Sequence, residues 1–430
     1  MKLPAVVLPR LYAEYLAASG RNSGALDVKF DEAEELAVID GFREGRTGPR
    51  RQGLSGVPGE HYLGHATTHV GMGLWYRVDP ALHLVGVEAA RHGASTRLDA
   101  FRNHIPSGDW TNPGHDGYTL AITVADTAEL DAPHFSAWRL HPDRNSAEVI
   151  PVDVVPEEKE LLSPLRGVWP VQELEDRTVA LIGAGSIGGA AAQALSSYGV
   201  RRLALVDPDR LYLDNFARHV VDPRNLGRYK VNALADQLRL RDSHLAVEAL
   251  SDDVIYDADL IRPLFDEVDC VLVSSDGVDS RRAANHLARK AGKPAVFACV
   301  LADGAFGEII RIRPPRTGCL LCARAELLAS GAMNPEPALD RGYGMGTRHL
   351  PMTAVGGDLA LIGQFAAKAT VATLLEELGY REQQLPGDHA IVGLQPKPDM
   401  APPFDMEATA GVRWRQLPPP RPECPTCGAA

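Results

Sequence analysis

Apolar runs and helix-like stretches alternate along the last two thirds of the chain. Residues 179–182 are all apolar, as expected for a strand buried on both faces, and the alanine-rich residues 190–195 continue as a helix. The alternation then predicts strands at 203–206, 268–273, 294–300 and 412–415, an antiparallel strand at 304–312, and helices at 233–240, 281–290 and 359–375. This pattern is typical of a doubly wound, mostly parallel α/β sheet.

The first third of the chain has a different pattern, in which glycine- and proline-rich loops separate short elements. Residues 9–17 predict a short helix, and 118–124 and 147–155 predict strands. Residues 151–170, which are charged and contain prolines, predict a linker and a helix that lead into the second domain. We therefore expect an α+β N-terminal domain over residues 1–160 and a separate α/β domain over residues 165–430.

A glycine-rich turn follows the first apolar strand of the second domain. Residues 183–188 read G-x-G-x-x-G between strand and helix. In such a unit Gly183 permits the turn, Gly185 lets the backbone approach a phosphate, and Gly188 lets the helix pack on the strand. The strand at 203–206 ends in Asp207, about 20 residues on, where an acid meets a nucleotide ribose. A Rossmann-like nucleotide site is predicted, and a nicotinamide-dependent oxidoreductase would show the same signal.

The residues after Asp207 favour a nucleoside triphosphate over a nicotinamide dinucleotide. Asp209, Asn215, Arg218 and Lys230 follow in close succession. Their cations suit the β- and γ-phosphate charges that must be neutralised when the α-phosphorus is attacked. For Arg218 and Lys230, the alternative is a solvated surface charge.

Asp276 follows the strand at 268–273, where the ligand crevice of an open α/β sheet lies. A carboxylate there can hold Mg²⁺ against a triphosphate. The alternative is that Asp276 caps the helix that follows it.

Four of the six cysteines form two C-x-x-C pairs, Cys319/Cys322 and Cys424/Cys427. Four thiolates in two such pairs match a tetrahedral structural Zn²⁺ site, which would staple the C-terminal segment onto the domain. Disulfides are the alternative, and the absence of an export signal disfavours them. Cys270 and Cys299 lie in apolar runs and are expected to be buried thiols.

Composition narrows the class of protein. The 430 residues are 45% hydrophobic and 23% charged, with a formal net charge of −12, which disfavours nucleic-acid and anionic-membrane binding. No apolar run approaches the roughly 20 residues of a transmembrane helix. The start of the chain is short and proline-broken, unlike a signal peptide. We expect a cytoplasmic protein.

One N-terminal segment, residues 102–116, resembles the zinc loop of JAB/MPN-type metalloproteases, in which His-x-His-Pro precedes Ser-x-x-Asp. Arg102 replaces the first ligand histidine, and only His104 and Asp116 keep ligand-capable types. Because an open catalytic zinc site needs about three protein ligands, the resemblance implies an inactive relative used as a binding surface. An ordinary loop is the alternative.

His65 and His69 have i,i+4 spacing but lack the glutamate of a zincin helix.

Residues from about 165 to the end resemble the ubiquitin-activating-enzyme superfamily, which includes the ThiF-type adenylyltransferases that activate sulfur carriers for molybdopterin and thiamine synthesis. The motifs that carry the resemblance, in family order, are 183–188, Val206-Asp207-Pro208-Asp209, Asn215-x-x-Arg218, Gly227-x-x-Lys230, Ser275-Asp276-x-x-x-x-Arg281 and the paired C-x-x-C knuckles. His219 departs from the family, which usually has glutamine after that arginine. The N-terminal third is not covered.

The resemblance implies that ATP·Mg²⁺ activates the C-terminal carboxylate of a small β-grasp protein ending in Gly-Gly. Asp207 would hold the ribose, Arg218 and Lys230 the phosphates, and Asp276 the Mg²⁺. The family often works as a dimer in which the partner subunit supplies an arginine, and Arg166 is the candidate here.

Two outcomes of that activation remain open, ubiquitin-like conjugation and sulfur-carrier activation. Residues 323–357 contain no cysteine, so we expect the chain to stop at the acyl adenylate, which a conjugating enzyme or sulfurtransferase would take. Fusion to a protease-like module favours a bacterial conjugation pathway. A catalytically silent scaffold is a further alternative.

Overall fold

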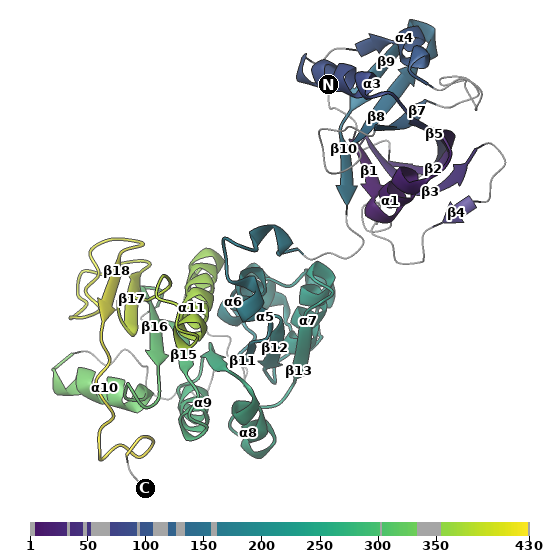
Figure 1. Cartoon of the computed structure of the whole chain (residues 1–430). Helices are drawn as coiled ribbons and strands as arrows, with labels where there is room; N and C mark the ends of the chain where they lie inside the picture. The colour runs from purple at the N-terminus through teal and green to yellow at the C-terminus, as the bar shows by residue number, and fades with distance from the viewer. Residues whose placement is uncertain are drawn as a thin grey trace. The chain divides into compact units, whose positions relative to one another are not determined.

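The computed structural model describes residues 5–31, 35–45, 50–52, 69–92, 95–105, 119–125, 134–155, 161–301, 303–332 and 354–428. The chain divides into two compact units, Met1–Lys159 and Glu160–Ala430. Figure 1 shows both units with most of their helices and strands labelled.

The first unit is built on a mixed sheet with the order β10-β1-β3-β2-β5-β7-β8-β9-β6 and with β4 beside β3. Its strands are β1 (Ala5–Pro9), β2 (Ser23–Asp31), β3 (Leu36–Glu44), β4 (Arg50–Gln52), β5 (His69–Arg77), β6 (Ser95–Arg97), β7 (Leu120–Ala125), β8 (His134–His141), β9 (Ser146–Ile150) and β10 (Val152–Val155), and its helices are α1 (Arg10–Ala18), α3 (Pro80–His92) and α4 (Leu98–Asn103). The helix predicted at 9–17 is α1.

The strand predicted at 147–155 is two strands, which corrects the sequence prediction. Pro151 separates β9, which pairs with β8, from β10, which pairs with β1. A proline has no N–H to donate to a strand ladder, so the chain changes partners at this residue.

The second unit contains the predicted doubly wound sheet, in the order β13-β12-β11-β14-β15-β16-β17-β18. Its strands are β11 (Thr178–Ile182), β12 (Arg202–Val206), β13 (Ala246–Leu250), β14 (Cys270–Val273), β15 (Ala295–Leu301), β16 (Phe306–Ile312), β17 (His389–Gly393) and β18 (Val412–Arg415). Strands β11 to β15 pair in parallel and β16 to β18 antiparallel. The fold prediction, including the antiparallel β16, is confirmed.

Helices cover both faces of this sheet (Figure 1). They are α5 (Val171–Glu175), α6 (Ser186–Tyr198), α7 (Lys230–Arg241), α8 (Ala258–Glu267), α9 (Val278–Lys290), α10 (Leu320–Ala329) and α11 (Gly356–Glu377). One core joins α6, α7 and α11 to one face of the strands, and the other joins α8, α9 and α10 to the opposite face. Within β11, Val179 and Leu181 enter the first core while Ala180 and Ile182 enter the second, so this strand is buried on both sides.

Helix α11 corrects the expectation that no apolar run approaches membrane-spanning length. It has 22 residues and passes that test by length and composition, alone among the described helices. Of the 18-residue apolar stretch that meets this test, 67% is buried inside the protein. Its inner side packs against α6, β15 and β16, so its hydrophobicity serves a protein core.

Candidate functional site

The glycine turn is held by side chains from neighbouring strand ends. Gly183 has φ +97°, and a Cβ there would lie 2.7 Å from the backbone nitrogen of Ser275. The Ser274 hydroxyl donates to the Gly183 carbonyl at 2.8 Å. A Cβ at Gly188 would lie 1.9 Å from that same carbonyl oxygen, so the helix can start here only with glycine. The turn is therefore set by the protein itself.

Asp207 is part of this support. Its Oδ2 accepts from the Ala184 N–H at 2.7 Å, and its Oδ1 accepts from the Asp209 N–H at 2.8 Å. Burial raises the pKa of Asp207, and the nearby Lys230 charge opposes that rise. Because each oxygen already accepts a backbone hydrogen bond, the clearest role of Asp207 is to hold the turn. Ribose binding by Asp207 stays a prediction.

His219 holds the same residue, Ala184, through its carbonyl group. Its Nε2 lies 2.8 Å from the Ala184 carbonyl oxygen, and its Nδ1 accepts from the Val221 N–H at 3.2 Å. These contacts require a neutral ring with its proton on Nε2. Burial, together with the charges of Lys230 and Arg218, lowers the pKa of His219. Sequence reasoning marked His219 only as a family departure, and nothing local in the sequence indicated its contact with the turn.

Lys230 begins α7 beside the turn. Its Nζ donates to Asp209 Oδ2 at 2.7 Å, and its side chain is 13% exposed while that of Asp209 is 60% exposed. Burial alone would lower the pKa of Lys230, but the charges of Asp207, Asp209 and Asp276 outweigh it and raise that pKa. The structure thus brings Lys230 and Asp276 into one electrostatic neighbourhood.

Asp276 is exposed and precedes α9. The residue at the helix cap is Gly277, and α9 has no side-chain cap hydrogen bond. The alternative interpretation of Asp276 as a helix cap is therefore wrong.

Arg218 and Asn215 lie in the turn around the short helix Leu213–Ala217. Asn215 Oδ1 accepts from the Tyr212 N–H at 2.9 Å, so its carbonyl side shapes this turn. Arg218 directly precedes His219, whose ring contacts Ala184, so the backbone of Arg218 lies near the glycine turn. The role of its guanidinium stays a prediction.

Gly185 differs from the other glycines of the turn. A Cβ at Gly185 would meet no atom within 4 Å. Its backbone is in the ordinary extended region, with φ −76° and ψ −156°. The protein itself therefore places no steric demand on this position. Gly185 is the N-cap of α6, where glycine is favoured over alanine, and close approach of a ligand is a second physical reason for a glycine here.

Arg166 is placed elsewhere in the second unit. It ends the short helix Ser163–Leu165, and its guanidinium lies 3.5 Å from Glu175 Oε1. Its assignment as the partner-supplied arginine stays a prediction.

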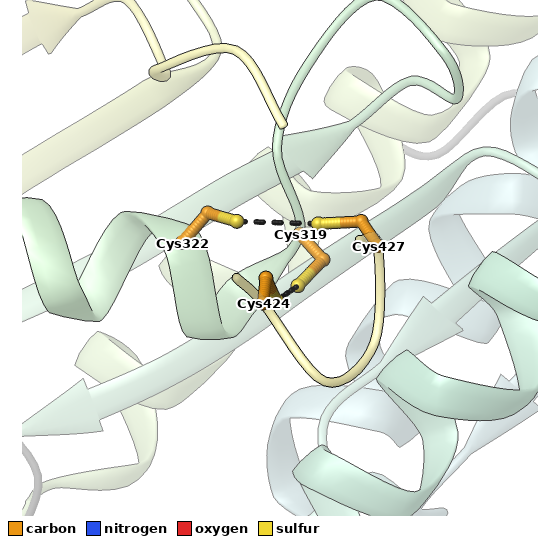
Figure 2. Close-up of side chains that lie close together, drawn as sticks. All are labelled: Cys319, Cys322, Cys424 and Cys427. Carbon is orange, nitrogen blue, oxygen red and sulfur yellow. Dashed lines mark hydrogen bonds between the residues drawn. The ribbon is translucent and has the colours of Figure 1, made fainter. Parts of the chain in front are cut away.

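The four knuckle cysteines converge, as Figure 2 shows. Their sulfurs all lie within 4.8 Å of one another, with 3.6 Å between Cys319 and Cys424 and 3.2 Å between Cys322 and Cys427. These separations exceed the roughly 2.05 Å of a disulfide and are near the roughly 3.8 Å edge of a tetrahedral zinc–thiolate site. The predicted tetrad is confirmed as a group that could hold a metal ion.

The knuckle favours a thiolate at Cys424, whereas burial raises the pKa of Cys319 and of Cys427. Burial by itself would raise the pKa of Cys424, but the amides of Cys427 and Thr426 together with the neighbouring thiols lower it to about 6. Amide hydrogen bonds to sulfur stabilise the charged form that a metal needs.

The two remaining cysteines are buried, as predicted. Burial raises the pKa of Cys270 to about 12. Cys299 Sγ lies 3.7 Å from Glu308 Oε2, and a neighbouring carboxylate disfavours a thiolate. Neither environment is that of an activated nucleophile.

The N-terminal segment that resembles a zinc loop is only partly described. Arg102 lies in α4 and His104 is the cap residue that follows it. Asp116 and His65 lie outside the described residues, as does the side chain of His69. The interpretation of residues 102–116 as a JAB/MPN-like loop stays a prediction.

At the carboxyl edge of the parallel strands, the chain therefore presents a preset glycine turn at a helix N-terminus, the ammonium group of Lys230 and the exposed carboxylate of Asp276. A helix N-terminus with free N–H groups suits phosphate oxygens, and a carboxylate beside it suits Mg²⁺. This arrangement can bind a nucleoside polyphosphate and stabilise negative charge that develops on it.

Comparisons with known proteins agree with this chemistry. A model of the ThiF family matches residues 158–386, just over half of the chain. Ubiquitin-like modifier-activating enzyme 5 of Branchiostoma floridae is 29% identical over 231 residues, covering 50% of this chain and 55% of that protein. Adenylyltransferase and sulfurtransferase MOCS3 of Xenopus laevis is 30% identical over 161 residues, covering 37% and 35%.

The chain spans about half the length of the ubiquitin-like modifier-activating enzymes that it matches. Among solved structures, E. coli MccB with ATP matches with a TM-score of 0.44 at 17% identity, covering 60% of this chain and 68% of that one.

Proposed function

The chain belongs to the ThiF family, and on that premise we propose that it uses ATP to activate the C-terminal glycine carboxylate of a ubiquitin-like or sulfur-carrier β-grasp protein. The observation that carries the proposal is the convergence of Lys230, Asp209 and Asp276 beside the glycine turn. The names of the matched relatives, an activating enzyme and an adenylyltransferase, support the same reaction class.

In the proposed reaction, a carboxylate oxygen of the carrier attacks the α-phosphorus. The bond from that phosphorus to the β-bridging oxygen breaks, pyrophosphate leaves, and an acyl adenylate remains. The turn and the N-terminus of α6 would hold phosphate oxygens, and Arg218 and Lys230 would neutralise the charge on the leaving pyrophosphate. Lys230 would exchange its present partner Asp209 for phosphate.

Two metal ions are part of the proposal. Asp276 offers the hard oxygen ligand that Mg²⁺ prefers, and the ion would neutralise phosphate charge when bound. The cysteine tetrad fits Zn²⁺ and would join the start of α10 to the C-terminal segment. We expect one zinc per chain by elemental analysis and loss of that zinc in Cys424→Ser.

The reaction is proposed to end at the adenylate, because Cys270 and Cys299 are buried and residues 323–357 contain no cysteine. Ubiquitin-like conjugation is favoured over sulfur transfer by the fused N-terminal unit, with a conjugating enzyme as the next acceptor. A homodimer is part of the same proposal, and light scattering of the full chain tests it.

The test is ATP–pyrophosphate exchange with the full chain and a Gly-Gly-ended β-grasp protein. We expect carrier-dependent exchange that falls at least about 100-fold in Asp276→Ala. Asp279→Ala, which removes an exposed carboxylate three residues further along, in the first turn of α9, should retain exchange. Exchange that is equally fast in Asp276→Ala would contradict the assigned role. ATP binding without exchange across candidate carriers would instead support the silent scaffold, and a spectral change with a nicotinamide cofactor would support the oxidoreductase.

A further inference from the structure

Arg281 is a buried cation whose environment leaves it incomplete. It lies on the inner side of α9 and is 2% exposed. Within the described ranges, no acceptor lies within hydrogen-bonding distance of its Nε or Nη2. Burying a charged group without such partners costs several kcal/mol, so native proteins rarely retain one without a reason.

Arg313 and Arg421 of this unit also have an orphaned nitrogen but are paired through their other nitrogens, whereas Arg289 on α9 has an orphaned Nη1 and is only half-buried. Arg313 also has an unpartnered Nε, yet its Nη groups bind Glu376 at 2.6 Å and Asp388 at 2.8 Å. Arg281 therefore differs in kind from Arg313. Its orphaned atoms form one edge of the guanidinium, and Nε–H and Nη2–H on that edge point in the same direction. This edge matches the two oxygens of a carboxylate.

The position of Arg281 relates it to the candidate site. It follows Asp276 by five residues and lies in the second turn of α9, which begins at the carboxyl edge of β14. Side chains on a helix lean toward its N-terminus, so the guanidinium is biased toward that edge.

The fold also separates Arg281 from the phosphate cations. The glycine turn leads into α6, and Lys230 begins α7, both packed on one face of the sheet. Helix α9 packs on the opposite face through residues such as Ala284 and Leu287. Strand β11 lies between β12 and β14, so the crevice between these two sets of helices opens where the strand order reverses. The phosphates have their own cations on the α6 side.

Asn285 adds a second orphaned donor on the same helix. It is one turn beyond Arg281 on the same side of α9 and is also 2% exposed. Its Oδ1 accepts from the Leu320 N–H at 3.0 Å, while its Nδ2 has no acceptor in the described structure. A short polypeptide segment supplies both kinds of acceptor, a terminal carboxylate and backbone carbonyls.

We propose that Arg281 binds the C-terminal carboxylate of the incoming polypeptide through its Nε–Nη2 edge, before that carboxylate attacks ATP. The proposal rests on the proposed function for the identity of the polypeptide. In this proposal, the α9 side of the crevice recognises the polypeptide carboxylate and the α6 side recognises the nucleotide. Burial of Arg281 without a partner then lowers the stability of the free protein, and the bound substrate supplies the missing partner.

Thermal unfolding of the full chain tests the first half of this inference. Arg281→Met keeps the length of the side chain and removes the unpaired charge, so the Tm should rise by about 5 °C. Arg282→Met changes the exposed neighbour on the same helix and should leave the Tm within about 1 °C. A fall in Tm for Arg281→Met would show that the guanidinium has a native partner, and would overturn the inference.

Peptide binding tests the second half without requiring the natural carrier. The probes are a synthetic hexapeptide ending in Gly-Gly with a free carboxylate and the same peptide as its C-terminal amide. The wild-type chain should prefer the free acid, and Arg281→Met should lose that preference by about tenfold or more. An equal preference in both proteins would overturn the inference.

ATP binding to the same variants separates this inference from the proposed function. Arg281→Met should bind ATP as the wild type does. A loss of ATP binding with the peptide preference intact would mean that Arg281 serves phosphate, which overturns the inference. If the wild-type chain binds no ATP, the proposed function fails while the peptide preference is still measured.

Discussion

The two halves of the second sheet treat buried charge in opposite ways. In the antiparallel half, Glu308 on β16 receives two hydrogen bonds from Arg324, at 2.7 and 2.5 Å, and lies 2.8 Å from His389 Nε2. Burial alone would raise the pKa of Glu308, but Arg324 and His389 lower it far below its usual range. This carboxylate is fully paired by its own fold.

A second network in the same half follows the same rule. Asp388 and Glu376 are each bound by both Arg311 and Arg313, through contacts of 2.6 to 2.9 Å. Paired and hydrogen-bonded charges of this kind fix the packing of strands and helices around them.

At the carboxyl edge of the parallel half, the charges are less completely partnered. Lys230 is held by the exposed Asp209, Asp276 is exposed, and Arg281 is buried with an orphaned edge. Charges that are paired within the protein stabilise the fold. Charges that lack such partners are candidates for contact with a ligand, which is the role proposed above for Lys230, Asp276 and Arg281.

The largest expected effect comes from disrupting the paired charges in the antiparallel half of the sheet. Glu308→Ala leaves Arg324 and His389 buried without their carboxylate, so the free energy of unfolding should fall by about 3–5 kcal/mol. Urea unfolding measures it. Asp279→Ala, an exposed carboxylate, should cost under about 0.5 kcal/mol. A loss below about 1 kcal/mol for Glu308→Ala would mean that this network does not hold the antiparallel half together.

Gly185→Ala should lower the exchange activity at the carboxyl edge of the parallel half without disrupting the fold. The protein leaves space for the added methyl group, so the Tm should fall only by the few degrees expected for alanine in place of glycine at a helix N-cap. A phosphate displaced by about 1 Å should lower exchange about 100-fold. Gly20→Ala, at another glycine with open space around it, is the control. Unchanged exchange in Gly185→Ala would show that phosphate does not approach this backbone.

The smallest effect is expected at His219, whose ring hydrogen-bonds to the Ala184 carbonyl in the glycine turn. His219→Leu removes the donor to the Ala184 carbonyl, which should raise the KM for ATP about tenfold and change kcat little. His219→Gln retains a donor and an acceptor and should recover most of that loss. If the two variants behave alike, the hydrogen bond does not position the turn.

Much of the second unit could be predicted from local sequence. The strand at 179–182, the glycine turn and the knuckle pairs are contiguous patterns with a direct physical meaning, and each has the predicted form in the structure. The break at Pro151 could also have been read from the sequence, since proline interrupts a strand ladder. The hydrogen bond of His219 to Ala184 joins residues 35 positions apart, and no spacing rule predicts it.

Arg281 also shows what local sequence cannot predict. Its place in a family motif was readable in the sequence, but whether its charge is paired depends on every segment that packs around α9. The alternation of strands and helices around the glycine turn, the turn itself and the ligand types of the metal tetrad follow from the sequence, because these depend on neighbours along the chain. Strands β13 and β17 and helices α8 and α10 were found only in the structure. The pairing of polar groups was also found only there, because it depends on distances between segments that folding brings together.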